Sequence, residues 1–391
     1  MRGLIVALSA FVMLGLIDGG LGVAWPSMRE FFDRGVAELG LLLAFGSVGY
    51  LTASAGYGRL HRRWGTGALL GIGSTLLFVG VTGFALGPAW GVVAGSAVLL
   101  GLGGGLVDTG MNAHAALAFD VGSINLLHAC YGVGATLGPV VITLSLVASD
   151  SWRWGYAAMA VLQVLTAAAV WSRKSRWAGS EPDLASEGPG TGVRAPLLFL
   201  VVLFFLYTGV EVGVGQWAFT LLSEGRGMST ASAGVWVAIY WGGLTVGRFG
   251  FGLVGDRLTP SRILNGSMVV SVAGIGWLWM DPGGLGVLGL PVAGLGFAAV
   301  FPTLVSVTPA RLGRVRSTKA MGYQLAAANL GAAAVPWVLG LIAESRGVAS
   351  LAPGMFIASV ALTVVYLASE RFTSGGPATT AQRSPDEPDQ V

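Results

Sequence analysis

The chain has 391 residues, of which 54% are hydrophobic and only 10% are charged, and its net charge is +3. A soluble domain usually has about 25% charged residues, so this composition excludes an ordinary soluble protein. The small positive charge is spread between the apolar runs and does not indicate nucleic-acid binding. Apolar runs long enough to cross ~30 Å of hydrocarbon recur along the whole chain, which predicts an all-α membrane protein. A transmembrane barrel would show short alternating segments instead.

The first apolar run follows Arg2 directly, and no small-residue cleavage site comes after it. We therefore expect a retained first helix rather than a removed signal peptide. The predicted helices of the first set are 4–25, 38–58, 67–86, 90–118, 125–147 and 153–172. Residues 173–195 are rich in Gly, Pro, Ser and charged residues and have the composition of a cytoplasmic linker. The predicted helices of the second set are 196–222, 231–254, 262–280, 284–308, 320–343 and 350–369.

This order predicts twelve transmembrane helices in two six-helix bundles, residues 1–172 and 196–370, followed by a disordered cytoplasmic tail over 371–391. If both termini are cytoplasmic, fifteen Lys and Arg residues near the membrane lie inside and five lie outside. This bias agrees with the positive-inside rule, so we expect both termini in the cytoplasm.

The two halves repeat a glycine-rich helix end that runs into a basic loop. GYGRLHRRWG follows the second predicted helix, and GFGLVGDRL follows the eighth. Repeated halves with polar residues at mid-membrane depth are typical of secondary transporters. The sequence has no GxxxxGK[ST] stretch, so ATP-driven transport has no support.

Three acidic residues lie well inside predicted spans: Asp18, Asp108 and Glu211. A carboxylate at the bilayer centre costs about 2.5–3.5 kcal/mol on insertion scales. A hydrogen bond to a neighbouring helix, or an ion pair with an intramembrane Arg, would give each acid a purely structural role. The one candidate base is Arg248, which could instead extend toward the cytoplasm or pair with Asp256. Because the acids outnumber the bases, we predict that the three acids couple transport to protons.

Amide, imidazole and aromatic side chains near these acids suit a small polyhydroxylated solute. Asn112 lies one turn from Asp108, so both can face one cavity. The candidate substrate-binding residues are Asn112, Asn125, His128, Gln216, Trp217, Tyr240, Trp241, Gln324 and Asn329. The alternative for the aromatic residues is an anchoring role at the membrane interface, and for the histidines a structural hydrogen bond.

Metal and cofactor chemistry find little support. The spacing of His61, His114 and His128 does not match a zinc site, and the single Cys130 excludes an intrachain disulfide and a cysteine cluster. We expect no cofactor and a proton as the coupling ion, with sodium as a lesser variant.

Several fragments together resemble one family. VDTGMNAHAALAF with SINLLHACYGVGATLGP, then YTGVEVGVGQW, WGGLTVGRFGFGLVGDR and FPTLVSVTPARLG, resemble major facilitator superfamily transporters across residues 1–370. More narrowly, they are similar to the fucose:proton symporter family. That resemblance implies a substrate- and proton-handling role for Asp108 and a second acid in the first span. Asp18 lies about one turn from that second position.

Two departures from the family pattern concern conformational change and direction. The loop motif at Gly58 has Arg62 where the superfamily has an Asp, whereas its second copy keeps Gly252, Asp256 and Arg257. GATLGP partly matches a bend associated with exporters, although the fourth span lacks the arginine that drug exporters of the superfamily carry.

These features predict proton-coupled symport of a small, sugar-like solute by alternating access. The alternative is a proton-antiporting exporter of drugs or metabolites. A receptor or scaffold would require a large soluble sensing segment, and an enzyme a catalytic constellation; the sequence shows neither. We expect a functional monomer in the bilayer of a cell membrane. Twenty Arg against two Lys indicate a GC-rich bacterial genome.

Overall fold

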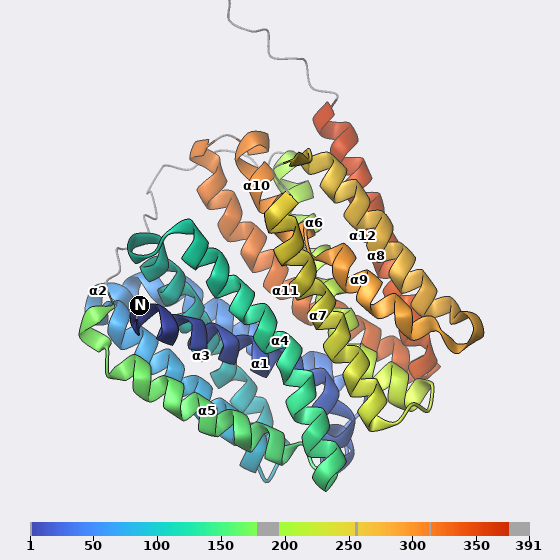
Figure 1. Cartoon of the computed structure of the whole chain (residues 1–391), viewed down its shortest axis with the longest axis horizontal. Helices are drawn as coiled ribbons and strands as arrows, with labels where there is room; N and C mark the ends of the chain where they lie inside the picture. Colours follow the sequence, from blue (N-terminus) through green and yellow to red (C-terminus); the bar gives the residue numbers. More distant parts are fainter. Residues whose placement is uncertain (1, 178–194, 255–256, 313, 375–391) are drawn as a thin grey trace, which may run out of the picture.

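The computed structural model describes residues 2–177, 195–254, 257–312 and 314–374, and this part of the chain is almost entirely helical (Figure 1). Ten of its helices are long and apolar enough to cross a membrane. The first group comprises α1 (Arg2–Phe31), α2 (Glu38–Leu86), α3 (Trp90–Ala118), α4 (Val121–Ser149) and α5 (Arg153–Trp171), with a 3₁₀ turn at Lys174–Arg176. The second group comprises α6 (Ala195–Thr220), α7 (Thr230–Val254), α8 (Pro260–Met280), α9 (Gly289–Phe297), α10 (Val300–Leu312), α11 (Arg314–Arg346) and α12 (Leu351–Ser374).

Two elements differ from the predicted spans. The predicted helices 38–58 and 67–86 form one assigned helix, α2, of 49 residues. Straight, it would be about 74 Å long, more than twice the bilayer core. Its backbone leaves the helical region at Gly65 (φ 73°, ψ 162°), a conformation that glycine adopts readily, so the chain turns there. The predicted span 284–308 is divided into α9 and α10 by a short turn after Phe297.

Helices of each group pack mainly against one another. In the first group α1 packs on α4, and α2 packs on α3 and α5; in the second, α6 packs on α11 and α12, and α9 packs on α7 and α8. The main pairs that join the groups are α1 with α6, α4 with α7, and α2 with α11, and α1 also contacts α7. The neighbouring courses of α4 and α7 can be followed in Figure 1. Most of the predicted linker and tail, residues 178–194 and 375–391, lies outside the described residues, so the domain boundaries stay a prediction.

Glycines allow α1 and α4 to cross at very short distance. A Cβ at Gly15 would lie 2.0 Å from the carbonyl oxygen of Tyr131, and one at Gly134 would lie 2.0 Å from that of Val12. Small residues at such crossings let backbones approach. The Gly134–Pro139 segment that resembles an exporter bend therefore serves as a helix-packing surface in this structure.

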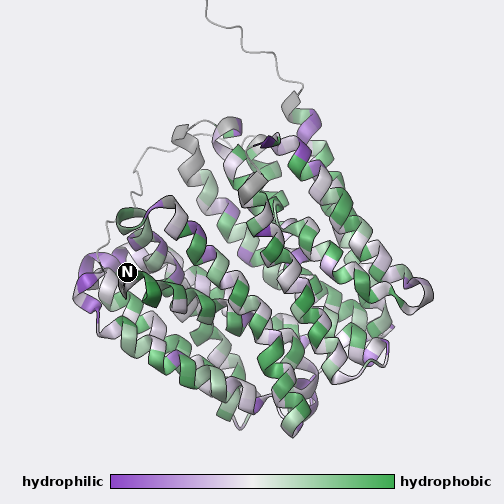
Figure 2. Cartoon of the chain, in the orientation of Figure 1, coloured by the Kyte–Doolittle hydropathy of each residue, from purple (hydrophilic) through white to green (hydrophobic). Residues whose placement is uncertain are grey.

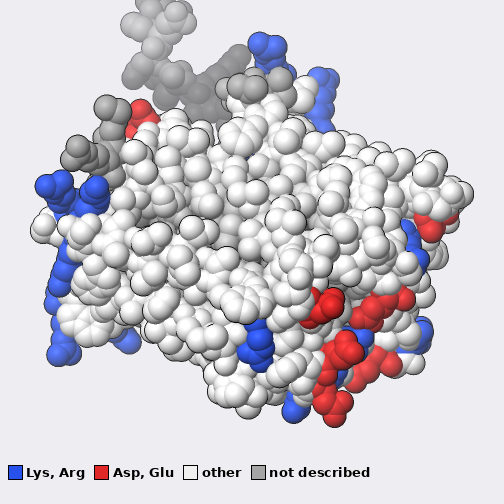
Figure 3. Space-filling model, turned by 60° about the horizontal axis from the view of Figure 1, so that its bottom comes forward, with Lys and Arg blue, Asp and Glu red and all other residues white. Residues whose placement is uncertain are grey.

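Hydrophobic residues cover the lengths of the helices, and hydrophilic residues gather at their ends (Figure 2). Contacts bring several helix ends together at one end of the molecule: Arg29 pairs with Glu224, and Arg153 donates to the carbonyl oxygen of Gly87. We call it the acidic end. Acidic side chains gather at the lower right of Figure 3, with Lys and Arg side chains among them. The described acids of this end are Glu30, Asp33, Glu38, Asp150, Glu224, Asp281 and Glu344. The opposite, basic end carries Arg59, Arg62, Arg63, Arg173, Lys174, Arg176, Arg257, Arg262 and Arg311.

Candidate functional site

The four helices α1–α4 bring the two acids of the first group into one cluster. The Tyr131 hydroxyl of α4 donates to a carboxylate oxygen of Asp18 in α1 at 3.0 Å. The Tyr50 hydroxyl of α2 donates to Asp108 of α3 at 2.5 Å, and the Asn112 amide donates to the same carboxylate at 3.0 Å. Asp18 and Asp108 also interact electrostatically with each other. Asn112, which the spacing predicts on the same face as Asp108, is thus hydrogen-bonded to it, and a tyrosine donates to each acid.

This cluster faces open space in the middle of the helix bundle. Asp18 lies deep in the protein, between α4 and α6, yet its side chain is exposed, as is that of His128. His128 interacts electrostatically with Asp108, which is half-buried. Gln216 of α6 donates to the backbone carbonyl of Asp18 at 3.0 Å, so the second group borders the same space. A carboxyl group that is central but accessible can exchange protons with water.

The third acid has a basic partner in the second group. The carboxylate of Glu211 in α6 lies 3.3 Å from the guanidinium of Arg248 in α7, and their side chains are 9% and 30% exposed. Arg248 also interacts electrostatically with His128 and Tyr131, so the pair faces the first group's cluster. For Arg248 the sequence leaves open an ion pair with one of the three acids, extension to the cytoplasm or pairing with Asp256; the structure pairs it with Glu211, and Asp256 lies outside the described residues. Glu211 therefore has a basic partner. The prediction of proton coupling, which rested on acids without bases to neutralise them, then applies to Asp18 and Asp108.

Two predicted substrate ligands hold helices of the second group together. Trp217 is fully buried and its indole donates to the carbonyl oxygen of Pro336 at 2.9 Å, which joins α6 to α11. Gln324 is fully buried and donates to the Thr308 hydroxyl at 3.0 Å, which joins α11 to α10. The geometry gives both side chains a packing role.

The remaining predicted ligands lie closer to the interface of the groups. Tyr240 is buried and its hydroxyl donates to the backbone carbonyl of Glu211 at 2.7 Å. Trp241 packs against Gly215, where a Cβ would be 2.2 Å from the indole ring. Asn329 donates to Leu325 of its own helix, and its backbone carbonyl accepts from Ser47 of α2. Asn125 is exposed near the start of α4.

Sequence reasoning missed Tyr50 and Tyr131, and it did not say which of the three acids pairs with Arg248. Tyrosines are usually found at the membrane boundary, so Tyr50 in the middle of a predicted span was a usable signal. Tyr207 is a second case: it is fully buried, its hydroxyl donates to the carbonyl oxygen of Phe297, and it lies beside the Glu211–Arg248 pair.

The predicted conformational motifs lie at the basic end. Gly58 and Arg62 precede the turn of α2 at Gly65, and Arg62 is exposed. Gly252 of α7 has open space where a Cβ would stand, and Arg257 is exposed. Among the described residues no group of three or more His, Cys, Asp or Glu side chains could hold a metal ion.

At the acidic end the groups are in tight contact. A Cβ at Gly40 would lie 2.4 Å from the Cα of Trp337, and one at Gly22 would lie 2.5 Å from the carbonyl oxygen of Gln216. Arg29 and Glu224 form a 2.6 Å ion pair between the groups. These contacts close the central space toward the acidic end.

Toward the basic end the helices of the first group and those of the second group move apart. Gly242 of α7 still lies in contact distance of Thr136, because a Cβ at Gly242 would be 3.6 Å from that side chain. Thr245 of α7 also lies 3.4 Å from Thr136, but a Cβ at Gly252, seven residues further on the same face, would have nothing within 4 Å. The same holds at Gly322 of α11, which lies seven residues before Asn329 on the face that meets α2. The central space is therefore open toward the basic end.

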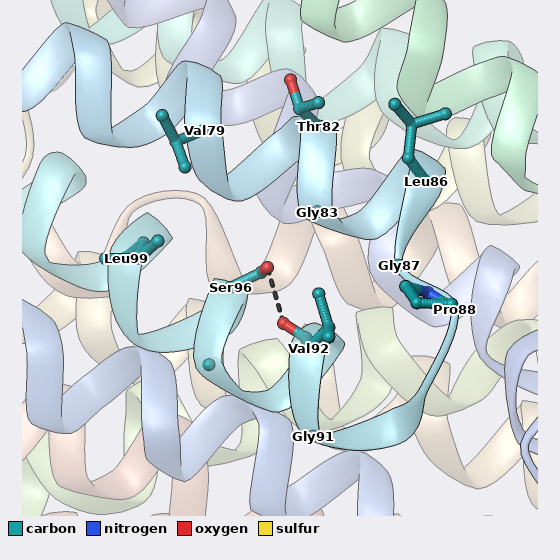
Figure 4. A pocket seen from close by; sticks show the side chains of 11 residues that line it. Val79, Thr82, Gly83, Leu86, Gly87, Pro88, Gly91, Val92, Ser96 and Leu99 are labelled. Carbon is teal, nitrogen blue, oxygen red and sulfur yellow. Dashed lines mark hydrogen bonds between the residues drawn. The ribbon is translucent and has the colours of Figure 1, made fainter.

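A second depression lies elsewhere, between the end of α2 and the start of α3 (Figure 4). It has a volume of about 540 Å³ and is lined by uncharged residues, among them Val79, Leu86 and Val92. The Ser96 hydroxyl at its wall donates to the Val92 carbonyl of its own helix at 2.7 Å. Because no titratable side chain lines it, this groove is not the candidate site.

A two-group helical bundle with acids in an accessible centre, closed at one end, is the arrangement expected of a membrane transporter. Residues 7–336 match the model of the Major Facilitator Superfamily, and the chain belongs to that family. The superfamily prediction is confirmed. Its members are transporters of small solutes, not enzymes.

Individual relatives are distant but cover most of the chain. "Bypass of stop codon protein 6" of Saccharomyces cerevisiae is 23% identical, over 95% of this chain and 83% of its own length. A "Putative glucose/galactose transporter" of Helicobacter pylori is 24% identical, over 85% of this chain and 87% of its own. The crystal structure of a D-xylose-proton symporter superposes with a TM-score of 0.76 at 16% identity, over 93% of this chain and 97% of its own. This last likeness shows the shared fold.

Proposed function

We propose that the protein is a proton-coupled symporter of a small, neutral, sugar-like solute that works by alternating access. In this proposal the chain crosses the membrane twelve times. Residues 38–64 and 66–86 of α2 are each long enough for a ~20-residue span, and α9 with α10 forms one crossing. The excess of basic side chains places the basic end, and both termini, in the cytoplasm. The structure then corresponds to a state open to the cytoplasm, in the cell membrane of a bacterium.

The observation that carries the proposal is the unneutralised pair Asp18 and Asp108. Each carboxyl group accepts hydrogen bonds from neutral donors, and neither forms a salt bridge with any residue that the structure describes. Both border a space that opens to one end only. A carboxyl group in such a place releases a proton to the cytoplasm in this state and takes one up from outside when the opening changes sides. Glu211, paired with Arg248, serves as a fixed counter-ion.

The chemistry of the site favours neutral solutes with hydroxyl groups. Two unneutralised carboxylates repel an anion but accept hydrogen bonds from hydroxyls. Asn112, His128 and the tyrosine hydroxyls supply further donors and acceptors within the same cluster. Relatives described as a glucose/galactose transporter and a fold neighbour described as a D-xylose-proton symporter support this solute class. Since one chain supplies every residue of the cluster, we propose a functional monomer.

Purified protein in liposomes tests the proposal. With an inward proton gradient, wild type is expected to accumulate a labelled hexose or pentose, and Asp108→Asn to lose accumulation while it keeps its thermal stability. Accumulation by Asp108→Asn equal to that of wild type would overturn the role of Asp108. Solute expulsion under the same gradient would identify the exporter alternative. Uptake that depends on sodium at fixed pH would identify sodium, and not the proton, as the coupling ion.

A further inference from the structure

A groove at the basic end is separate from the central acids and from the groove of Figure 4. It lies where α2 turns at Gly65 and the segment after α5 packs against α2, and its volume is about 380 Å³. Trp64, Trp171 and Lys174 are among the side chains that line it. We call it the Trp64 groove.

The walls of the Trp64 groove are held in place by close packing. A Cβ at Gly67 would lie 1.9 Å from the carbonyl oxygen of Lys174, so only a glycine lets the segment after α5 approach α2 this closely. The Trp171 ring packs on Gly71, and its indole donates to the Thr75 hydroxyl at 3.0 Å. The groove is thus a formed feature of the fold rather than a gap between loose side chains.

Two cations at the groove stand over the aromatic rings that line it. The guanidinium of Arg63 lies 5.9 Å from the ring centre of Trp64, and the ammonium of Lys174 lies 5.5 Å from that of Trp171. Both cations are exposed, and neither forms an ion pair with a described residue. A ring face stabilises a cation without an acceptor for its N–H groups, so those donors stay available to a ligand.

Arg173, which precedes Lys174 in the sequence, supplies a third hydrogen-bond donor. The Nε of Arg173 is buried and has no hydrogen-bond acceptor among the described residues. Arg59 and Arg176 add exposed positive charge at the same end of the first group. The local charge of the described residues is therefore strongly positive.

The tryptophans of the groove indicate that it lies where a bilayer meets water. Trp64 and Trp171 are 47% and 39% exposed, and tryptophans favour this boundary. A ligand in the groove would meet N–H donors and indole faces together, which matches a phosphate attached to an apolar chain. A free inorganic anion would use the cations but not the indoles. We propose that the Trp64 groove binds the headgroup of an anionic phospholipid, with Arg63 and Lys174 on its phosphate.

Lipid titration of the full-length protein in neutral detergent tests this proposal. Phosphatidylglycerol is added at increasing concentration, with phosphatidylcholine as the neutral lipid and sodium phosphate as the free anion. Bound lipid is counted by native mass spectrometry, and thermal stability is measured in parallel. The test variant is Arg63→Gln/Lys174→Gln. The control is Arg257→Gln/Arg262→Gln, which removes the same charge from exposed positions at the same end.

Wild type and control are expected to bind phosphatidylglycerol and to gain thermal stability from it. The test variant should bind it about 25-fold more weakly, at roughly fivefold for each basic residue removed. Trp64→Leu, which keeps every charge, should also weaken binding and so exclude a purely electrostatic effect. Equal binding by wild type and test variant, stabilisation by sodium phosphate alone, or no binding to wild type would each overturn the proposal. None of these outcomes depends on the transported solute.

Discussion

The Glu211–Arg248 pair gives the sharpest test of the structure. Arg248→Gln leaves the carboxylate of Glu211, which is 9% exposed, without its charged partner. Removal of one partner from a buried pair costs about 3–5 kcal/mol. Because the side chain of Arg248 is 30% exposed, water compensates part of that loss, and about 2–3 kcal/mol is a better expectation. At roughly 2 °C for each kcal/mol in a chain of this size, Tm should fall by about 4–6 °C.

A double-mutant cycle separates pairing from general damage. Glu211→Gln should destabilise the protein as well, because it leaves Arg248 without a counter-charge. The double variant Glu211→Gln/Arg248→Gln buries two neutral amides and should be more stable than the sum of the single changes by about 2–3 kcal/mol. Purified proteins in one detergent, compared by thermal unfolding, provide the four values.

The chain offers a matched control for this cycle. Arg34, in the loop before α2, and Glu38, the first residue of α2, form a 3.9 Å pair with side chains 39% and 26% exposed. Their coupling should not exceed about 1 kcal/mol. If the Glu211–Arg248 cycle gave a coupling as small as this control, the two side chains would not be paired as the structure shows.

Three further predictions concern the closed acidic end and the start of α4. Gly40→Val would clash with Trp337, whose Cα would be 2.4 Å from the new Cβ, so the acidic end should stay open. In a background of His128→Cys/Cys130→Ser, which moves the single cysteine into the central cluster, the cysteine should then react more slowly with a thiol reagent added from the basic end. Glu224→Gln removes an ion pair whose side chains are 25% and 29% exposed, and a loss of about 1 kcal/mol should shift the population toward the same state about fivefold in that labelling assay. The Ser123 amide donates to Asp120 at 2.7 Å and holds the pKa of Asp120 below its usual value. Asp120→Ala should therefore speed hydrogen exchange at Ser123 at neutral pH, and the difference should disappear only as pH falls through that lowered pKa. An unchanged labelling rate or an unchanged exchange rate would contradict the contact concerned.

Composition and hydropathy predicted most of the fold, because each helix must supply about 20 apolar residues to cross a bilayer. They missed the continuity of α2. Residues 59–64 read as a polar loop, but Leu, His, Arg and Trp there are compatible with a helix, and the reversal needs only Gly65. Hydropathy reports burial in lipid and not the backbone conformation of a single glycine.

The site was predicted in part. Periodicity within one helix correctly placed Asn112 beside Asp108, because their separation fixes a common face. Periodicity says nothing of the rotation of one helix against another, and therefore the partners Tyr50, Tyr131 and Arg248 could not be assigned to their acids. For the same reason Trp217 and Gln324 were expected in the site, whereas α10 and α11 hold them in helix packing.

Proton movement during solute entry tests the central claim most directly. Protein in liposomes without an imposed gradient is given a labelled sugar, and the pH of a weakly buffered outer solution is recorded. The account predicts that the outer solution becomes more alkaline as sugar enters, and that Asp108→Asn abolishes this change. Sugar entry with no change in outer pH, or an undiminished change in Asp108→Asn, would contradict it.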